Sequence, residues 1–193
     1  MERDSLLTTD QPSDETLVAH VIDGNTEAFG ALVRRYEQKL LRYGRRFMSG
    51  REDIEDIVQE VFLRAYKNLR SFDRSRRFSP WIYRIAHNSF VNEMRRATRH
   101  PTVTFDADIL LPNRTRESPE DDHDRAEMRE FLRKGLEKLD QKYREPLILY
   151  YFEEMSYAAI SEILHIPVST VGVRINRGRI ALRKIYSMSL PSL

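Results

Sequence analysis

The sequence predicts an all-α protein composed of two small helical domains joined by a flexible linker. Apolar residues recur at the spacing of an amphipathic helix through most of the chain, which has only 7 glycines in 193 residues. Between residues 100 and 117 this periodicity gives way to Pro, Thr, Asp and Asn, a composition typical of a linker. The length suits one medium domain or two small ones, and the linker favours two.

The first helical block, residues 14–99, follows an N-terminal tail, residues 1–13. A short helix at its start ends at Gly24, and Asn25 then caps a longer helix. The apolar face of that longer helix consists of Phe29, Leu32, Val33, Tyr36, Leu40, Leu41 and Phe47. After a break at Ser49 and Gly50, a third helix is expected over about 52–66.

A loop from about residue 68 to 78 precedes the fourth helix. Ser79 and Pro80 predict the N-cap and the first residue of this helix, which runs to about Arg99. Its inward residues are expected to be Trp81, Ile82, Ile85, Ala86 and Met94.

The second block, residues 118–187, restarts with Ser118 as a cap and Pro119 as the first helical residue, and a short C-terminal tail, residues 188–193, follows it. Within this block, residues 156–186 have the pattern of a helix-turn-helix that binds double-stranded DNA. Ser156 caps a short apolar helix, Pro167 breaks the pattern, and a second helix begins near Val168.

The outer face of that second helix carries hydroxyl and guanidinium groups, the groups that bind phosphates and base edges. Its members are Ser169, Thr170, Arg174, Arg177, Arg179 and Arg183. Spacing alone is equally compatible with simple packing of two helices. Five cations and no acid follow residue 163, and this one-signed charge favours DNA binding over an ordinary solvated face.

The net charge of +2 conceals an uneven distribution. Between Arg64 and Arg99 the basic residues are 64, 67, 70, 74, 76, 77, 84, 95, 96 and 99, against the acids Asp73 and Glu93. From Thr102 to Glu130 acids predominate. Two basic surfaces separated by an acidic connector indicate a nucleic-acid-binding protein.

Several classes of function are not expected. The chain has no cysteine, so the sequence offers no disulfide, thiolate nucleophile or Cys-type zinc site. The five histidines, at positions 20, 87, 100, 123 and 165, are scattered, and we expect neither a metal nor another cofactor. Without a signal peptide or an apolar run of about 18 residues, we expect a cytoplasmic protein that does not insert into a membrane.

The motifs of both blocks resemble those of bacterial RNA polymerase sigma factors. Residues 143–179, which include Tyr-Arg-Glu-Pro-Leu and Ser-Thr-Val, are similar to sigma region 4. Residues 53–62, Asp-Ile-Glu-Asp-Ile-Val-Gln-Glu-Val-Phe, and residues 72–88 are similar to the core-binding and promoter-melting segments of region 2. No room remains for the extra domains of housekeeping sigma factors, so the chain resembles the extracytoplasmic-function (ECF) class.

This resemblance implies a transcription initiation factor without enzymatic activity. It would bind core RNA polymerase through the β′ clamp coiled coil and the β flap. It would then direct polymerase to promoters through their −35 and −10 elements and promote melting, holding the non-template single strand. Relatives of this class are often inhibited by an anti-sigma protein, so we expect one here.

The resemblance also assigns roles to residues. The core-binding face would comprise Asp53, Asp56, Gln59 and Glu60. The −10 DNA contacts would come from Phe72, Arg76, Arg77, Phe78, Trp81, Arg84, Asn88, Asn92, Arg95 and Arg96. The −35 contacts would come from Ser169, Thr170, Val173, Arg174, Arg177, Arg179 and Arg183, although Gly172 and Val173 stand where relatives commonly carry a basic or polar residue.

Residue types alone leave alternatives open. The row Asp53, Asp56 and Glu60 suits an ordinary solvated face or, less well, the metal site of a helical enzyme. The rings of Phe72, Phe78 and Trp81 are each better explained as core than as platforms for bases. The acidic linker either mimics nucleic acid within polymerase or serves as a tether. A helix-turn-helix regulator that never joins polymerase is the main alternative function.

Overall fold

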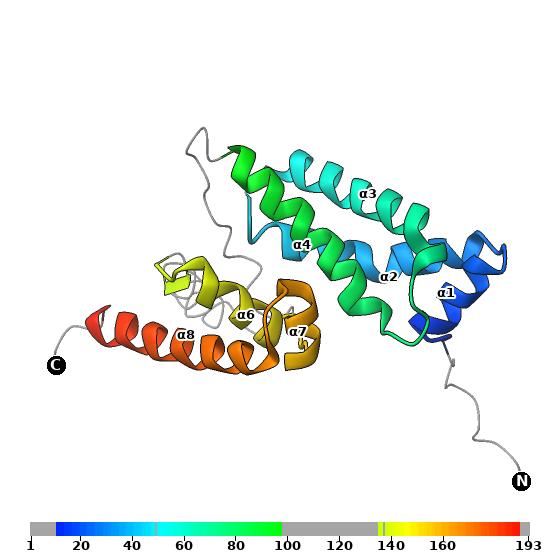
Figure 1. Cartoon of the computed structure of the whole chain (residues 1–193). Coiled ribbons are helices and arrows are strands. Elements are labelled where there is room, and N and C mark those ends of the chain that lie inside the picture. Colours follow the sequence, from blue (N-terminus) through cyan, green and yellow to red (C-terminus); the bar gives the residue numbers. More distant parts are fainter. Residues whose placement is uncertain (1–10, 49, 98–134, 137, 190–193) are drawn as a thin grey trace, which may run out of the picture.

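The computed structural model describes residues 11–48, 50–97, 135–136 and 138–189 of the chain, and within them it contains seven α-helices, one 3-10 turn and no strand (Figure 1). The predicted all-α class is therefore confirmed. The helices form two groups, which we call the N-terminal domain (α1 to α4) and the C-terminal domain (α6 to α8). The predicted linker, residues 100–117, lies outside the described residues.

The N-terminal domain consists of α1 (Asp14–Ile22), α2 (Glu27–Gly44), α3 (Arg51–Asn68), the 3-10 turn η1 (Leu69–Ser71) and α4 (Phe78–Ala97). The predicted end signal at Gly24 is confirmed, since its φ of 105° lies in the left-handed region that glycine tolerates. Asn25 also acts as predicted, because its Oδ1 accepts hydrogen bonds from the N–H groups of Glu27 and Ala28 at 3.1 and 3.3 Å.

The start of α4 differs from the prediction. Ser79 is not the N-cap and Pro80 is not the first residue, because the helix already begins at Phe78. The N–H of Phe78 donates to Oε1 of Glu15 at 3.2 Å, so a carboxylate from α1 satisfies this N–H at the helix start. A contact between residues 63 positions apart cannot be inferred from local cap signals.

Aromatic rings fill the centre of the N-terminal domain. Tyr36, Phe78, Tyr83 and Phe90 are each at most 2% exposed, and Tyr43 lies among them. The ring of Tyr43 makes edge-to-face contacts with Tyr83 and Phe90, with centroids 5.3 and 6.2 Å apart. The predicted inward face of α4 is confirmed for Ile82 and Ala86, which are fully buried, and Trp81, Ile85 and Met94 are partly buried and pack against the core. The prediction omits two fully buried rings of this face, Tyr83 and Phe90.

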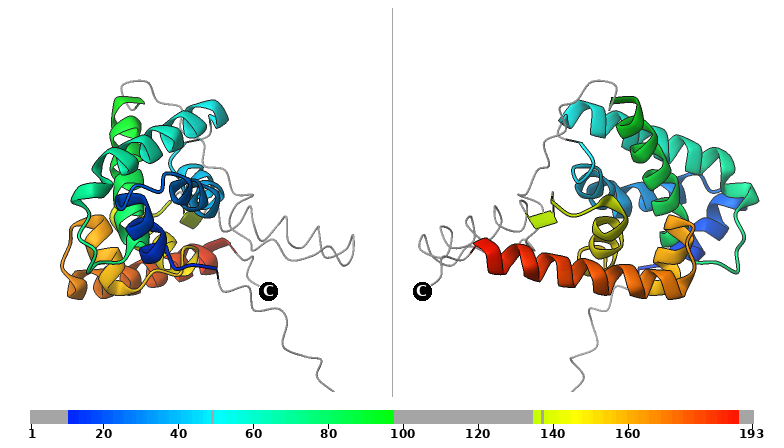
Figure 2. Two further views of the ribbon diagram at one scale, coloured as in Figure 1. Left: turned by 90° about the vertical axis from the view of Figure 1, so that its right-hand side faces the viewer. Right: turned by 60° about the vertical axis from the view of Figure 1, so that its left-hand side comes forward.

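The C-terminal domain consists of α6 (Gln141–Tyr151), α7 (Tyr157–Leu164) and α8 (Val168–Ser189). Its core is mainly aliphatic, and Leu149, Ile160, Ile163 and Val171 are fully buried. In both views of Figure 2 the C-terminal helices lie along one side of the N-terminal domain, and α7 packs against α4. The two domains are therefore in contact.

In the described part of the chain, no helix by itself has the length and apolarity of a membrane span. Only α7 and α8 (to Tyr186) together meet those criteria, with a 99° bend between them.

Candidate nucleic-acid interface

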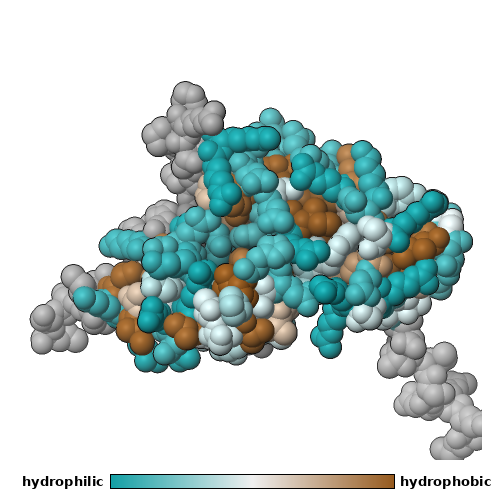
Figure 3. Space-filling model, viewed as in Figure 1, coloured by the Kyte–Doolittle hydropathy of each residue, from teal (hydrophilic) through white to brown (hydrophobic). Residues whose placement is uncertain are grey.

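A groove on the N-terminal domain lies between α2 and α3 and has a volume of about 760 Å³. We call it the α2–α3 groove. Its apolar lining residues are Phe29, Val33, Leu41, Val58, Phe62, Leu63 and Tyr66. Leu63 is 60% exposed and Tyr66 44% exposed, which is unusual for large apolar side chains on one helix. Hydrophilic residues cover most of the face drawn in Figure 3, with separate hydrophobic patches over the N-terminal domain.

The sequence analysis does not predict this groove, because it treats the apolar residues of α2 as a single face. Leu32, Tyr36 and Leu40 are indeed buried, whereas Phe29, Val33 and Leu41 are only partly buried and line the groove. A signal was nevertheless present in α3. Leu63 and Tyr66 lie at i and i+3 outside the inward stripe, where a solvated helix normally carries polar residues.

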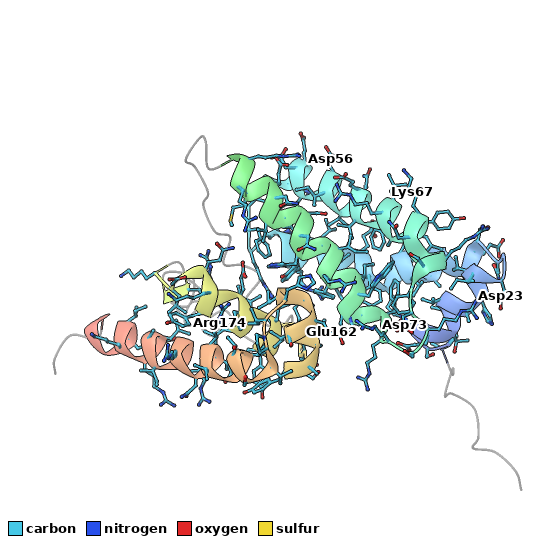
Figure 4. All side chains as sticks on the ribbon, viewed as in Figure 1. Asp23, Asp56, Lys67, Asp73, Glu162 and Arg174 are labelled. Atoms are coloured by element: carbon cyan, nitrogen blue, oxygen red, sulfur yellow. The ribbon has the colours of Figure 1, made fainter. Side chains whose placement is uncertain are left out.

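The acidic face of α3 borders this groove. Asp53, Asp56, Gln59 and Glu60 are all exposed, and Gln59 also lines the groove. Glu60 pairs with Arg64, with 2.6 Å between the carboxylate and guanidinium atoms, so its charge is partly compensated. No three His, Asp or Glu side chains gather as metal ligands within the described residues. Figure 4 shows Asp56 on α3, apart from Asp73 in the loop before α4.

The loop before α4 is held in shape by Asp73. Its Oδ1 accepts hydrogen bonds from the Ser75 Oγ at 2.7 Å and the Ser75 N–H at 3.0 Å, and these bonds lower the pKa of Asp73. Arg76 lies 3.4 Å from the other carboxylate oxygen, and Arg76 and Arg77 are both exposed. Together with the exposed Arg74, the loop therefore presents three guanidinium groups to solvent on a defined backbone.

The aromatic residues in and beside this loop are less exposed than its arginines. Phe72 is 6% exposed and Phe78 is fully buried, so both belong to the core, and neither offers a face to a base in this structure. Trp81 packs edge-on against Phe72 with centroids 5.1 Å apart and remains half-buried. Of the three rings assigned to −10 DNA contact, only Trp81 retains exposed surface.

The outer face of α4 matches the prediction more closely. Asn88, Asn92, Arg95 and Arg96 are exposed, and Arg84 is half-buried. Arg96 lies 3.4 Å from a carboxylate oxygen of Glu93. This face thus combines amide groups, which can form paired hydrogen bonds with a base edge, and cations for phosphates. The predicted end of the helix at Arg99 lies outside the described residues.

The second interface is built by the turn between α7 and α8. Ser156 is the N-cap of α7 as predicted, since its Oγ accepts a hydrogen bond from the Ala159 N–H at 3.2 Å. His165 then adopts a left-handed conformation with φ of 52°, and the Ser161 Oγ donates to the Ile166 carbonyl. The resulting 99° bend is within the range of helix-turn-helix motifs.

The outward face of α8 carries most of the predicted −35 residues. Ser169, Val173, Arg177, Arg179 and Arg183 are exposed. Thr170 and Arg174 are half-buried, and the charge of Arg174 acts on Asp140 and Glu145 of the α6 region. Arg174 therefore faces its own domain more than the sequence suggested (Figure 4). Within the helix start, Gly172 leaves room for the ring edge of Tyr157, which would lie 3.3 Å from an added Cβ.

Comparison with protein families identifies both domains. Residues 32–100 match the family model described as Sigma-70 region 2, and residues 131–182 match the model described as Sigma-70, region 4. The two matches cover the domain that bears the α2–α3 groove and α4, and the domain that bears the helix-turn-helix.

The regions matched by similar proteins extend over most of the chain. The ECF RNA polymerase sigma factor SigW of Bacillus subtilis is 38% identical over 176 residues, which are 86% of this chain and 93% of SigW. The ECF RNA polymerase sigma-E factor of Haemophilus influenzae is 34% identical over 177 residues, 88% of this chain and 93% of that protein.

Two solved structures have the same arrangement of helices. CnrH in complex with the cytosolic domain of CnrY has a TM-score of 0.69 and 28% identity, and the match covers 93% of this chain and 100% of CnrH. The sigma factor RpoE of Bartonella quintana, in complex with the anti-sigma factor NepR, has a TM-score of 0.65. This match covers 86% of this chain and 100% of RpoE, with 20% identity. At that identity, the similarity shows only that the two proteins share a fold.

Proposed function

Because the chain belongs to the ECF sigma factors of the sigma-70 family, we propose that it binds core RNA polymerase and directs it to promoters. The −35 element would bind α8, and the −10 element would bind the loop before α4 and α4 itself. The observation that supports this proposal is the presence of two separate basic surfaces, each on its own domain, together with the α2–α3 groove. The protein would act by positioning polymerase and would perform no bond chemistry itself.

The partner at α3 would be the coiled coil of the polymerase β′ subunit. Asp53, Asp56, Gln59 and Glu60 would set its orientation through complementary charge, since charged groups steer association and fix register. The adjoining α2–α3 groove would take an apolar side chain of the partner, with Leu63 and Tyr66 at its rim. The β flap would bind the C-terminal domain.

Promoter melting would depend on the face around α4. Extruding a base from a duplex costs a few kcal/mol, and each captured base returns about 1–3 kcal/mol. Several contacts are therefore needed, and the exposed side chains of Arg76, Arg77, Asn88 and Asn92 would offer them to the non-template strand. The backbone and side chains of the loop that Asp73 organises would hold the extruded base.

The −35 element would be recognised in the major groove by the start of α8. Arg177 would contact a phosphate, whereas Val173, which is 49% exposed, would meet a thymine methyl group. The two contacts can be tested separately. Deoxyuridine in place of thymidine removes the methyl group that Val173 would contact and leaves the phosphates unchanged. Arg177→Ala would instead weaken binding to all sequences and reduce its salt dependence.

An anti-sigma protein is a proposed regulator. The two similar solved structures are named as complexes, one of them of a sigma factor with an anti-sigma factor, and the matched chain of each is covered over its full length. We also propose the cytoplasm, where polymerase works, as the place of action. A regulator that acts without polymerase would share the helix-turn-helix but would leave the α2–α3 groove and acidic face without a role.

The central experiment is reconstitution with core polymerase. The purified chain should be retained by immobilised core enzyme and should support run-off transcription from a cognate promoter. Asp56→Lys should weaken core binding roughly tenfold, because it reverses one charge of the complementary face. The matched control is Glu162→Lys, which makes the same charge change on α7 (both residues are labelled in Figure 4). Equal binding of the two variants would contradict the assignment of α3.

A further inference from the structure

The first helix of the chain, α1, lies outside the match to Sigma-70 region 2, which begins at residue 32. In the structure, however, α1 contacts both η1 and α4, the two elements that flank the segment of residues 73–77. We call this segment the 73–77 loop, and it carries the exposed Arg74, Arg76 and Arg77. Helix α1 is thus placed to act on the loop that the proposed function assigns to the −10 element.

A carboxylate of α1 binds the backbone at the point where the 73–77 loop becomes α4. The N–H of Phe78, the first residue of α4, donates to Oε1 of Glu15 at 3.2 Å. The first N–H groups of a helix have no partner within the helix, and a carboxylate is a strong acceptor for such a group. This hydrogen bond therefore fixes the backbone of Phe78 relative to α1.

The ring of Phe78 is held by the same helix through a second residue. It is fully buried and packs edge-on against Tyr36, with the two centroids 5.4 Å apart. The Tyr36 hydroxyl donates to Oδ2 of Asp14, the first residue of α1. Arg35 pairs with the other oxygen of that carboxylate. Both the backbone and the ring of Phe78 therefore depend on the first turn of α1.

The other end of α1 reaches the middle of the loop. Asp23, directly after the helix, lies 3.5 Å from a guanidinium nitrogen of Arg74 (Asp23 is labelled in Figure 4). Both side chains are more than half exposed, so this ion pair contributes little to stability and a phosphate can replace the carboxylate. The stronger attachment of the loop to α1 is therefore the hydrogen bond of Glu15.

The position of the Phe78 backbone affects the direction of the loop arginines. The Arg76 N–H donates to the Asp73 carbonyl at 2.9 Å, which closes a turn. Arg77 connects this turn to Phe78, so a displacement of Phe78 moves Arg76 and Arg77 together. A loop that is already in its binding shape loses less conformational entropy when it binds a ligand, and it therefore binds more tightly.

We propose that Glu15 is a positioning residue for capture of the −10 strand: its bond to the Phe78 N–H keeps the 73–77 loop in the shape that holds an extruded base. This inference rests on the proposed function, because it takes the loop as part of the −10 contacts. Glu15 acts through Phe78 and needs no contact with DNA. Its negative charge disfavours phosphate, so charge alone predicts tighter DNA binding when Glu15 is removed. Positioning predicts weaker binding, and the two effects have opposite signs.

The test compares three variants of the full chain. Glu15→Ala removes both the acceptor and the charge, and it should fold because residue 15 is exposed and alanine favours helix. Glu15→Gln removes the charge but keeps a carbonyl oxygen that can accept the same hydrogen bond. Glu52→Ala is the matched control, since Glu52 is also an exposed carboxylate in the first turn of its helix, at the end of α3 far from the loop.

Amide hydrogen exchange of the free protein, followed by NMR, measures the attachment itself. The Phe78 N–H should exchange at least about tenfold faster in Glu15→Ala than in Glu52→Ala, because a hydrogen bond to a charged group is lost. The N–H of Phe90, a fully buried residue of the same domain, should exchange equally in both variants. Equal acceleration of both amides would overturn the proposal, because Glu15 would then stabilise the domain as a whole.

Strand capture is measured with each protein bound to saturating core polymerase. The probe is a fluorescent single-stranded oligonucleotide with the non-template −10 sequence of the promoter used for run-off transcription. Glu15→Ala should bind it about tenfold more weakly than Glu52→Ala, since the loop is no longer held in its binding shape. Glu15→Gln should bind it at least as tightly as the parent protein, and core polymerase should bind all four proteins equally.

Two results would overturn the role of Glu15. The first is binding of the oligonucleotide by Glu15→Ala that equals or exceeds that of Glu52→Ala. The second is an equal loss in Glu15→Gln and Glu15→Ala, which would assign the effect to charge. Both results are distinct from a failure of the proposed function, in which the parent protein itself would not bind core polymerase.

Discussion

The two domains each support a long helix with a basic outer face, α4 in one and α8 in the other, but they do so with different cores. The N-terminal domain supports α4 with buried aromatic rings, among them Tyr43, Tyr83 and Phe90. The C-terminal domain supports α8 with smaller aliphatic side chains, while Tyr150, Tyr151 and Tyr157 remain 37–50% exposed. Each aromatic ring buries about 150–250 Å², so a few residues stabilise the first domain strongly. The second domain depends more on caps and close helix contacts.

The largest expected effect follows from the aromatic core. Phe90→Ala should lower the free energy of unfolding of the N-terminal domain by about 3–5 kcal/mol, because it removes a fully buried ring. Trp81 is the only tryptophan, so its fluorescence in a urea titration reports this domain specifically. Leu63→Ala, at a site that is 60% exposed, is the control and should change stability by less than about 0.5 kcal/mol. Similar losses in both variants would contradict the described core.

The second prediction tests close packing in the C-terminal domain. A Cβ at Gly178 would lie 2.7 Å from Cδ1 of Leu147, so Gly178→Ala should destabilise this domain by about 1–3 kcal/mol. Gly172→Ala places its Cβ 3.3 Å from the edge of the exposed Tyr157 ring, which can move, and the change should be neutral or stabilising by up to about 1 kcal/mol. Thermal unfolding followed by circular dichroism compares the two.

The fluorescence of Trp81 shows whether Gly178→Ala also affects the N-terminal domain. If Gly178→Ala also shifts the Trp81 transition, the domains unfold as one unit, and the comparison between independent cores no longer holds. If only the circular dichroism transition moves, each core is stable by itself. The fluorescence trace of the same sample distinguishes these outcomes.

The third prediction concerns a polar contact between the two domains, that of His87 on α4 with Glu145 on α6. His87 has a pKa of about 4 in the folded chain against an ordinary value near 6.5, because it is buried and faces the charges of His165 and Arg95. Between these values the unfolded chain binds the proton and the folded chain does not. The folded state therefore loses stability as pH falls from about 6.5 toward 4, by about 2 kcal/mol between pH 7 and pH 5.

The variant His87→Gln isolates this contribution. Tyr43 and Glu145, which also face His87, are retained in the variant, and the raised pKa of Glu145 acts in the opposite direction in both proteins. Urea unfolding at the two pH values should show the extra loss in the parent protein only. An equal pH dependence of the two proteins would mean that folding does not lower the pKa of His87, and it would contradict the prediction.

The smallest effects are expected at the helix caps. Ser156→Ala removes the acceptor for the Ala159 N–H and should cost about 1 kcal/mol in the C-terminal domain. Ser13→Ala removes the equivalent bond to the Thr16 N–H at the start of α1. Because α1 is also tied to α2 through Asp14 and Arg35, we expect the smaller loss at Ser13. Circular dichroism melts of the two variants rank the caps, and a larger loss at Ser13 would reverse the comparison.

The sequence by itself determined the elements whose causes are local. The helical class, the end of α1 at Gly24, the cap at Ser156 and the helix-turn-helix all follow from side-chain spacing and backbone preference within a few residues. The same holds for most of the basic residues on the outer faces of α4 and α8, because an exposed charge needs only water around it. The motifs in Asp53 to Phe62 and around the turn at Pro167 also sufficed to identify the family.

Only the tertiary structure decided which apolar residues are buried and which polar residues meet. Phe29 and Val33 lie on the same helix face as Leu32, yet they line an open groove because α3 covers only part of α2. Glu15 moves the start of α4 to Phe78, and Arg46 meets Glu153 across the domain contact. These contacts join residues that are far apart in the chain, and their free energy depends on burial that no local pattern encodes.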